Sequence, residues 1–461
     1  MRTSVAILAA GLGTRMRSKQ AKVLHRAGGM ALVECVVEAA REFAEPEDIV
    51  CVTGHQADQV EALLAPRGLR FARQQQQKGT GHALVCAKDA LAGKQDGLLM
   101  VLYGDTPLLS APTLLLLRDK QAASNAVATL ITTTLEDPTG YGRVLIDASG
   151  AVTAIVEHKD ATPDQRAIRV INSGIYCFRA DLLWKHLPEV QPNSISGEFY
   201  LTDMAAILQR HGHRVEPMHV EDPSELLGIN TRVELAAADR LLRQRKNEAL
   251  MLSGVTIERP ETVTIDAHVK VASDTVIEPF ARLLGSTEIG EDCRIGAGSI
   301  LENSRLADRV HIAPYTLIAD SEVDAGAHIG PFSRLRMHAQ VGADARIGNF
   351  VELKKTKLGA GAKSQHLAYL GDSEIGANSN IGAGTITCNY DGERKHATHI
   401  GRGVFIGSNS TLVAPLEIGD QAYVGAASVI TENVPGDALA LGRARQVNKP
   451  GWVSKRKKKQ L

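Results

Sequence analysis

The chain has 461 residues, 44% of them hydrophobic, which is enough sequence for two or three globular cores. Lys and Arg together number 52 and so do Asp and Glu, and this balance argues against nucleic acid or a membrane surface as the main partner. The six cysteines form no C-x-x-C pair, and the sequence shows neither a secretory signal nor an apolar run of membrane-spanning length, so we expect a cytoplasmic protein without a thiolate metal site.

The first half alternates short apolar runs with helical patterns. Strands are predicted within 4–11, 48–54 and 97–105, and a helix within 31–43. This alternation indicates an α/β, Rossmann-like domain with a parallel sheet. Because ligands bind beyond the carboxyl ends of parallel strands, we expect chemistry in the loops that follow these three strands.

The first of these loops is rich in glycine. Residues 8–16 read LAAGLGTRM, and Gly11 and Gly13 leave backbone N–H groups free to hold phosphates near a helix start. Met16 stands where the dinucleotide-binding pattern needs its third glycine, and the loop is not a Walker A sequence. A plain tight turn would need the same glycines, so neighbouring motifs must decide its role.

Those motifs resemble the sugar-nucleotide pyrophosphorylases. LAAGLGTRM is followed by Lys22, with Ala21 where that family usually has proline, and then come QQQQKGTGHA, YGDTPLL, TGYGRV, IVEHKDA, INSGIY and LLGINTR in the family's order. The resemblance implies that Arg15 and Lys22 are catalytic. The nucleotide and sugar site that it implies consists of Leu8, Ala9, Ala10, Gly11, Lys22, Gln74, Gly79, Thr80, Tyr103, Gly104, Asp105, Gly142, Glu157, Asn172 and Asn230.

The resemblance also implies a reaction. A sugar 1-phosphate attacks the α-phosphate of UTP and releases pyrophosphate, a step that needs charge neutralisation and alignment more than a strong base. Asp105 and Asn230 would hold Mg²⁺ through oxygen atoms. The uracil base would be read by Gln74, Gly79 and Thr80, and the sugar would be held by Gly142, Glu157 and Asn172.

The second half has a different period. Residues 231–250 show helical spacing and are predicted to form a linker helix between a domain at 1–230 and a domain at 251–461. Beyond them, aliphatic residues recur every six positions with occasional slips, usually with a small residue four positions later. Hexads predict a parallel β-helix, with three hexads in each coil and the aliphatic residue pointing inward. The basic run at 455–459 is expected to be a solvated tail.

The hexads are interrupted at 359–374 and at 387–399, and interruptions of repeats often form a binding face. The motifs HLAYLGD and IGAGTITCNYDG in and beside these segments resemble the acetyltransferase half of the bacterial bifunctional N-acetylglucosamine-1-phosphate uridylyltransferases/glucosamine-1-phosphate N-acetyltransferases. The resemblance covers nearly the whole chain. It implies a left-handed β-helix, a homotrimer with active sites between subunits, acetyl-CoA and UTP as co-substrates, and a cell-wall precursor as the product.

In that family His366 would be the general base that takes a proton from the 2-amine of glucosamine 1-phosphate as the amine attacks the thioester of acetyl-CoA. We also hypothesise that Glu352 orients His366. The sugar-phosphate site implied by the resemblance consists of Arg336, Lys354, Tyr369 and Asn380. The acetyl-CoA site consists of Ala383, Asn389, Tyr390, Ser408, Ala426 and Arg443.

The repeat itself groups some of these residues. Arg336 and Lys354 are 18 positions apart, as are Ser408 and Ala426, so each pair should stack on successive coils at ~4.8 Å. Two stacked cations repel unless an anion lies between them, so we expect phosphate there and no loss of stability in the unliganded protein when Lys354 is removed. The alternative is a solvated surface ladder.

Two other functions stay open. The chain could be a uridylyltransferase only, with the β-helix as an oligomerisation module, although HLAYLGD and CNYDG argue against that. It could also be a non-catalytic scaffold, in which case LAAGLGTRM, Asp105 and Asn230 would have no reason to occur together. No nucleic-acid or membrane partner is expected.

Overall fold

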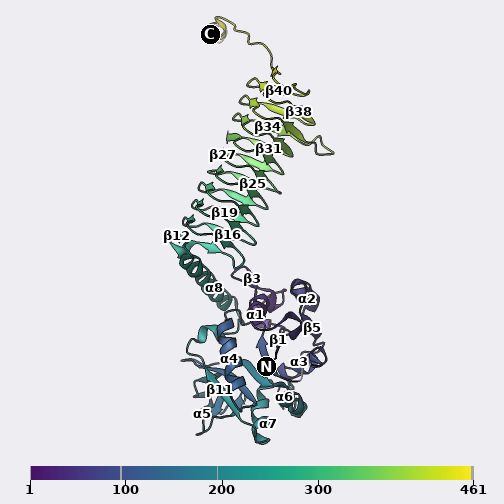
Figure 1. Cartoon of the computed structure of the whole chain (residues 1–461), viewed down its shortest axis with the longest axis vertical. Helices are drawn as coiled ribbons and strands as arrows, with labels where there is room; N and C mark the ends of the chain where they lie inside the picture. Colours follow the sequence, from purple (N-terminus) through teal and green to yellow (C-terminus); the bar gives the residue numbers. More distant parts are fainter. Residues whose placement is uncertain (1, 94–95, 195, 458–461) are drawn as a thin grey trace. The chain divides into compact units, whose positions relative to one another are not determined.

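The computed structural model describes residues 2–93, 96–194 and 196–457. The chain forms two compact units, Met1–Leu242 and Arg243–Leu461 (Figure 1). The predicted α/β domain and the left-handed β-helix of hexapeptide repeats are both confirmed.

The predicted parallel strands lie together in the first unit. Strand β1 (Thr3–Leu8) pairs in parallel with β4 (Ile49–Thr53) and with β6 (Leu98–Tyr103). Strand β5 (Arg70–Arg73) extends the sheet beyond β4. Because β1, β4 and β6 run the same way, the loops after them meet at one edge of the sheet, as the alternation of strands and helices predicts.

The other half of this sheet is antiparallel in part, which the sequence did not predict. Strand β10 (Val170–Arg179) runs antiparallel to β6 and to β7 (Ala128–Thr134), and β11 (Val215–His219) is parallel to β7. The hairpin of β8 (Arg143–Ile146) and β9 (Val152–Val156) joins β10 at its side.

Side chains alternate between two cores on the faces of this sheet. On β1, Val5 and Ile7 enter one core while Ala6 and Leu8 enter the other, so the strand is buried on both faces. The helices of the first unit are α1 (Leu32–Arg41), α2 (Ala57–Leu64), α3 (Thr80–Ala87), α4 (Ala111–Ala123), α5 (Pro163–Arg166), α6 (Ala180–His186) and α7 (Met204–Arg210).

The second unit is a stack of three-sided coils (Figure 1). Between β12 (Thr256–Ile257) and β41 (Leu439–Ala440), the strands described form parallel sheets of 11, 10 and 9 strands, each strand pairing with those one coil away. The inward aliphatic residues form one continuous core, as in the fully buried Leu283, Leu335 and Leu353. Each coil therefore buries its neighbours, and the hexads account for the fold.

One predicted interruption is wrong. Within 359–374 the coil continues through β30 (Lys363–His366) and β31 (Tyr369–Gly371). Ser364 occupies the inward position and pairs with Ile347 on one side and Ile381 on the other. A serine in place of the aliphatic residue hid this coil from the pattern.

The second interruption is real. Strand β34 (Ile386–Cys388) and strand β35 (Thr398–Ile400) belong to different sheets, and residues 389–397 form a loop at the corner between them.

The predicted linker helix is present as α8 (Arg232–Leu252), and the chain passes from the first compact unit to the second between Leu242 and Arg243, within this helix. The domain boundaries at 230 and 250 stay predictions. Near the carboxyl end, α9 (Trp452–Lys457) includes the first residues of the basic run, of which Lys455 and Arg456 are exposed as expected, and residues 458–459 of that run lie outside the described residues. In the part of the chain that the structure describes, no helix is both long and apolar enough to cross a membrane.

Candidate functional sites

Four of the predicted residues of the first unit meet at the carboxyl edge of the sheet. The Lys22 ammonium forms an ion pair with the Asp105 carboxylate and donates to Asn230 Oδ1 at 3.1 Å. Arg15 Nη2 donates to the same oxygen at 2.8 Å. The Lys22 and Asp105 side chains are only 14% and 15% exposed, so their charges interact with little screening by water.

Backbone contacts hold the loops that carry these groups. The Gly104 N–H donates to Leu8 O at 2.9 Å, and the Ile229 N–H donates to Asp105 O at 2.9 Å. Gly13 has φ 62°, and a Cβ at this position would lie 2.5 Å from Lys22 Cβ. A glycine is therefore required where the phosphate loop approaches Lys22.

Ala21 stands where the resemblance leads one to expect proline, and its backbone is held by a hydrogen bond. Its φ of −56° is one that proline adopts, and its N–H donates to Gln56 Oε1 at 2.7 Å. Proline has no N–H, so this hydrogen bond takes over part of the restraint that a ring would give.

The residues expected to read the base lie at the start of α3. Gln74 is buried and its Nε2 donates to Gly79 O at 3.0 Å. Gly79 has φ 96°, and a Cβ there would lie 2.6 Å from Phe199 O. Thr80 Oγ1 accepts the Leu201 N–H at 3.0 Å, so this hydrogen bond ties the start of α3 to the 3₁₀ turn Leu201–Asp203.

The residues expected to hold the sugar form a second group. Asn172 N donates to Gly142 O at 2.9 Å, and a Cβ on Gly142 would lie 3.7 Å from Glu157 Oε1. Thr202 Oγ1 donates to Glu157 Oε1 at 3.2 Å. Burial raises the pKa of Glu157 and also that of Tyr103, on which Glu157 acts electrostatically. The site thus holds a carboxyl group whose ionised form is disfavoured.

This arrangement fits a divalent metal and a triphosphate. Asp105 and Asn230 direct oxygen atoms at the same cation, Lys22, and oxygen is the ligand that Mg²⁺ prefers. Arg15 and the glycine loop would supply positive charge and amide donors around it.

In the second unit, Arg336 and Lys354 stack as predicted, because β25 (Arg334–Arg336) pairs with β28 (Glu352–Lys354) in that register. Arg336 Nε lies 2.6 Å from Glu352 Oε1, and Lys354 Nζ lies 2.7 Å from Asp372 Oδ2. Each cation thus has its own carboxylate, and the expectation that only a bound anion relieves their repulsion is wrong. Since the Lys354 side chain is 5% exposed, a solvated ladder is excluded for it.

A third cation joins this pair from the corner loop. The Lys354 ammonium lowers the pKa of Lys395, and the charge of Arg336 acts in the same direction. Asn389 Nδ2 donates to Asp372 Oδ2, the oxygen that Lys354 also contacts. Lys395 and Asp372 were missed by the sequence interpretation, although both stand in or beside the motifs that it used.

His366 ends β30 and is exposed, with its ring set by a residue of the neighbouring coil. Its Nδ1 lies 2.9 Å from Asn349 Oδ1, and β27 (Arg346–Asn349) pairs with β30 so that these two residues are opposite. An amide oxygen accepts, so the contact pairs it with an Nδ1–H group, and in the neutral ring with that tautomer Nε2 is the nitrogen that can accept a proton. The guess that Glu352 orients His366 is wrong, because Glu352 pairs with Arg336.

The side chains of Tyr369 and Asn389 both lie beside Gly371. A Cβ on Gly371 would lie 2.6 Å from Tyr369 OH and 2.7 Å from Asn389 Nδ2. Glycine at 371 thus leaves room for both polar groups. Asn380 lies on β33 (Asn380–Ile381), the next strand after β30 in its sheet.

Three residues expected to bind acetyl-CoA form a column. Ala383, Ser408 and Ala426 follow equivalent strands of successive coils, with Asn409 N donating to Ala383 O at 2.7 Å and Ala427 N to Ser408 O at 2.8 Å. The predicted stacking of Ser408 and Ala426 is confirmed. Two further members of the predicted site are exposed, Tyr390 in the corner loop and Arg443 beyond β41.

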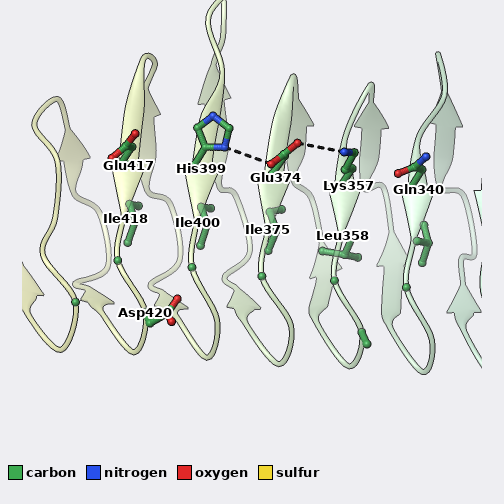
Figure 2. Close-up of a pocket in the computed structure, with 18 of the residues that line it drawn as sticks. Gln340, Lys357, Leu358, Glu374, Ile375, His399, Ile400, Glu417, Ile418 and Asp420 are labelled. Atoms are coloured by element: carbon green, nitrogen blue, oxygen red, sulfur yellow. Dashed lines mark ion pairs between the residues drawn. The ribbon is translucent and has the colours of Figure 1, made fainter.

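A groove of about 1090 Å³ lies on another face of the β-helix (Figure 2). Glu374 lies between His399 at 3.5 Å and Lys357 at 3.4 Å across neighbouring coils, and Asp420 stands at its rim. The described residues that line the groove include none of the predicted acetyltransferase residues. The large groove and the candidate chemistry thus belong to different faces.

Comparisons with known proteins agree with both halves. Residues 5–171 match the MobA-like NTP transferase domain, residues 268–303 match the bacterial transferase hexapeptide, and residues 398–432 match the hexapeptide repeat of succinyl-transferase.

Curated relatives match nearly the full length. A bifunctional protein GlmU of Solibacter usitatus is 56% identical over 455 residues, covering 99% of this chain and 97% of the relative. Those of Koribacter versatilis and Trichlorobacter lovleyi are 48% and 45% identical, covering 99% of this chain and 98% and 99% of the relatives. The chain therefore belongs to the GlmU family, the bifunctional N-acetylglucosamine-1-phosphate uridylyltransferases/glucosamine-1-phosphate N-acetyltransferases.

Proposed function

We propose that the Arg15–Lys22–Asp105–Asn230 cluster is the uridylyltransferase site and that His366 with Arg336, Lys354 and Lys395 forms the acetyltransferase site. Each unit contains a polar cluster with the groups that one of the two reactions needs, and this observation carries the proposal. The enzyme acetylates glucosamine 1-phosphate and then transfers a uridylyl group to the product, giving UDP-N-acetylglucosamine.

In uridylyl transfer, the chain mainly supplies charge and alignment. Lys22 and Arg15 neutralise the phosphates of UTP while the glycine-loop amides hold them in line with the attacking sugar phosphate. Asp105 and Asn230 would hold Mg²⁺, and the ion would supply positive charge at the leaving pyrophosphate.

In acetyl transfer, His366 Nε2 accepts a proton from the 2-amine as the amine attacks the acetyl thioester and displaces the CoA thiol. Asn349 accepts from Nδ1–H and so directs Nε2 toward the amine, which makes Asn349 a positioning residue. Lys354, Arg336 and Lys395 bind the sugar phosphate, and the column of Ala383, Ser408 and Ala426 lines the acetyl-CoA groove.

We propose a homotrimer assembled through the β-helix. At one corner the rings of Tyr315, Phe332 and Phe350 stack at 5.4 and 5.5 Å, although each is about half exposed. Leu367, beside His366, is 62% exposed at the same corner. A neighbouring subunit over this ridge would bury apolar surface next to the proposed base, which supports active sites between subunits.

We propose a cytoplasmic location, where UTP and acetyl-CoA are available. All six cysteines are free, which suits a reducing compartment.

One coupled assay tests the function. Thiol release from acetyl-CoA in the presence of glucosamine 1-phosphate, followed by pyrophosphate release on addition of UTP and Mg²⁺, is the expected result. Pyrophosphate release from supplied N-acetylglucosamine 1-phosphate without any thiol release would favour a uridylyltransferase with a structural β-helix. The absence of both would favour a scaffold.

A further inference from the structure

A cluster of imidazoles and one carboxylate lies outside both proposed sites. His186 ends α6, Glu189 ends the 3₁₀ turn Leu187–Glu189, and His211 directly follows α7. One ligand atom from each residue lies within 4.8 Å of the ligand atoms of the other two. Residues from separate elements thus bring three metal-ligating side chains to one point.

The carboxylate lies between the two rings. Glu189 Oε1 is 2.7 Å from His186 Nδ1, and Glu189 Oε2 is 2.9 Å from His211 Nε2. The two ring centroids are 4.2 Å apart. Ligand atoms around a tetrahedral zinc ion are roughly 3.3 Å apart, since each lies about 2.0–2.1 Å from the metal. The two contacts with Glu189 would each widen by about half an ångström to admit an ion, and the two imidazole nitrogens, which lie within 4.8 Å of each other, would adjust to the same spacing.

The cluster also contains an unused polar atom. His186 is 3% exposed, and its Nε2 has no hydrogen-bond partner among the described residues. Nε2 lies on the other side of the ring from Nδ1, the atom that faces Glu189, so Nδ1 is the ligand that the buried His186 would present to an ion.

A third imidazole lies beside the cluster, because the ring centroid of His213 is 5.5 Å from that of His186.

We propose that His186, Glu189 and His211 form a binding site for a divalent transition-metal ion of the zinc class, separate from the proposed Mg²⁺ site. Two imidazole nitrogens and one carboxylate oxygen are a zinc-type donor set, whereas Mg²⁺ prefers oxygen alone. The ion would join the end of α6 to the end of α7. Helix α7 follows Thr202, the residue that donates to Glu157, so the site would also steady one wall of the sugar pocket.

The test is zinc binding to the full-length, metal-stripped protein by isothermal titration calorimetry, with Mg²⁺ in excess and thiols kept reduced. The variants are His211→Ala and Glu189→Gln, because His211 is 43% exposed and its loss leaves the core intact. His219→Ala is the matched control, since His219 is an exposed histidine of the same unit.

Wild type and His219→Ala are expected to bind one zinc ion per chain with equal affinity. Affinity should fall at least about tenfold in both cluster variants, because even an outer-shell partner of a metal ligand is worth that much. Cobalt(II) bound to the wild type should show visible d–d absorption without a thiolate charge-transfer band. Equal zinc affinity in His211→Ala and His219→Ala, no binding by the wild type, or a thiolate band would each overturn the proposal.

Discussion

Lys354 and Lys355 are adjacent cations with very different surroundings. The Lys354 side chain is 5% exposed and lies 2.7 Å from Asp372, whereas that of Lys355 is 70% exposed and lies 3.9 Å from the same carboxylate. The sequence alone suggested that Lys354 could be removed without loss of stability, because it stacks on another cation. The structure contradicts this, since the buried Asp372 would then lose its main partner.

Lys354→Ala is expected to weaken both substrate binding and folding. The KM for glucosamine 1-phosphate should rise roughly 10- to 100-fold, because a hydrogen bond to a charged group contributes about 1.5–3 kcal/mol. The free energy of unfolding should fall by on the order of 3 kcal/mol, because a buried carboxylate loses its cation. Steady-state kinetics and urea unfolding measure the two effects.

Lys355→Ala is the control and should change neither quantity appreciably, because an exposed, distant pair contributes little. A KM effect of the same size in both variants would remove the buried lysine from the phosphate site.

A second residue-scale prediction concerns Glu157. Burial raises its pKa in the folded protein, so folding binds a proton between the ordinary carboxyl pKa and the raised one, and stability falls as pH rises through that window. Glu157→Gln removes this penalty, so the variant should have a higher Tm than the wild type above the window and lose the difference below it. Its uridylyltransfer rate should fall if the carboxylate holds the sugar.

Thermal unfolding from pH 4 to 8 checks the sign of this effect. A Tm difference that grows on acidification would contradict the raised pKa.

The candidate sites were predictable only in part, for a physical reason. Lys22, Asp105 and Asn230 lie in or beside sequence motifs that occur in the same order as in the family, so their roles could be inferred before their contacts were known. Asn349 and Asp372 act through neighbours on the next coil, 17 and 18 positions away in sequence. The coil slips by one residue at irregular places, so the sequence tells which side chains become opposite only where no slip intervenes, as between Arg336 and Lys354.

At the scale of the element, the hexads predicted the β-helix but not every coil. Ser364 and Ser379 are both fully buried in inward or near-inward positions. The Ser379 hydroxyl donates to Gly401 O at 2.8 Å and accepts the Val404 N–H at 3.1 Å. The Ser364 hydroxyl has no partner among the described residues.

These two serines give a matched prediction. Ser379→Ala should destabilise the protein by about 1–3 kcal/mol, because it leaves a buried N–H and C=O unpaired. Ser364→Ala should be neutral or stabilising by up to about 1 kcal/mol, because it removes an unpaired buried hydroxyl at almost constant volume. Urea unfolding of both variants is the measurement, and equal destabilisation would show that the Ser364 hydroxyl is paired in solution.

The first unit shows where element prediction fails for another reason. The alternation of strands and helices predicts parallel pairing, and β1, β4 and β6 follow it. Strand β10 enters between β6 and β7 and runs against both, because its pairing depends on contacts distant in sequence. A repeat or an alternation carries no information about such a strand.

At the scale of the molecule, each compact unit holds one of the two proposed catalytic sites. Asp105→Ala is expected to abolish uridylyl transfer and spare acetyl transfer, because the carboxylate belongs to the first unit. His366→Ala should lower acetyl transfer roughly 10²- to 10⁴-fold, the usual contribution of a general base, and spare uridylyl transfer from N-acetylglucosamine 1-phosphate.

Mixing the two variants should restore conversion of glucosamine 1-phosphate to UDP-N-acetylglucosamine, because the acetylated intermediate diffuses between molecules. Asp119→Ala, an exposed carboxylate of the first unit, is the control and should keep both activities. Parallel loss of both activities in folded Asp105→Ala would contradict the assignment of one reaction to each unit.

The corner loop at 389–397 has one more consequence. Although it lengthens its coil, Ile375 still pairs with Ile400, and Ile400 with Ile418, so the ladder on either side keeps its register. A three-sided coil can therefore gain or lose residues at a vertex while its walls stay unchanged. New chemistry can be added to such a protein, or removed from it, by exchanging vertices alone. A variant in which a short turn replaces this loop should keep every coil of the β-helix and lose Asn389, Tyr390 and Lys395 together.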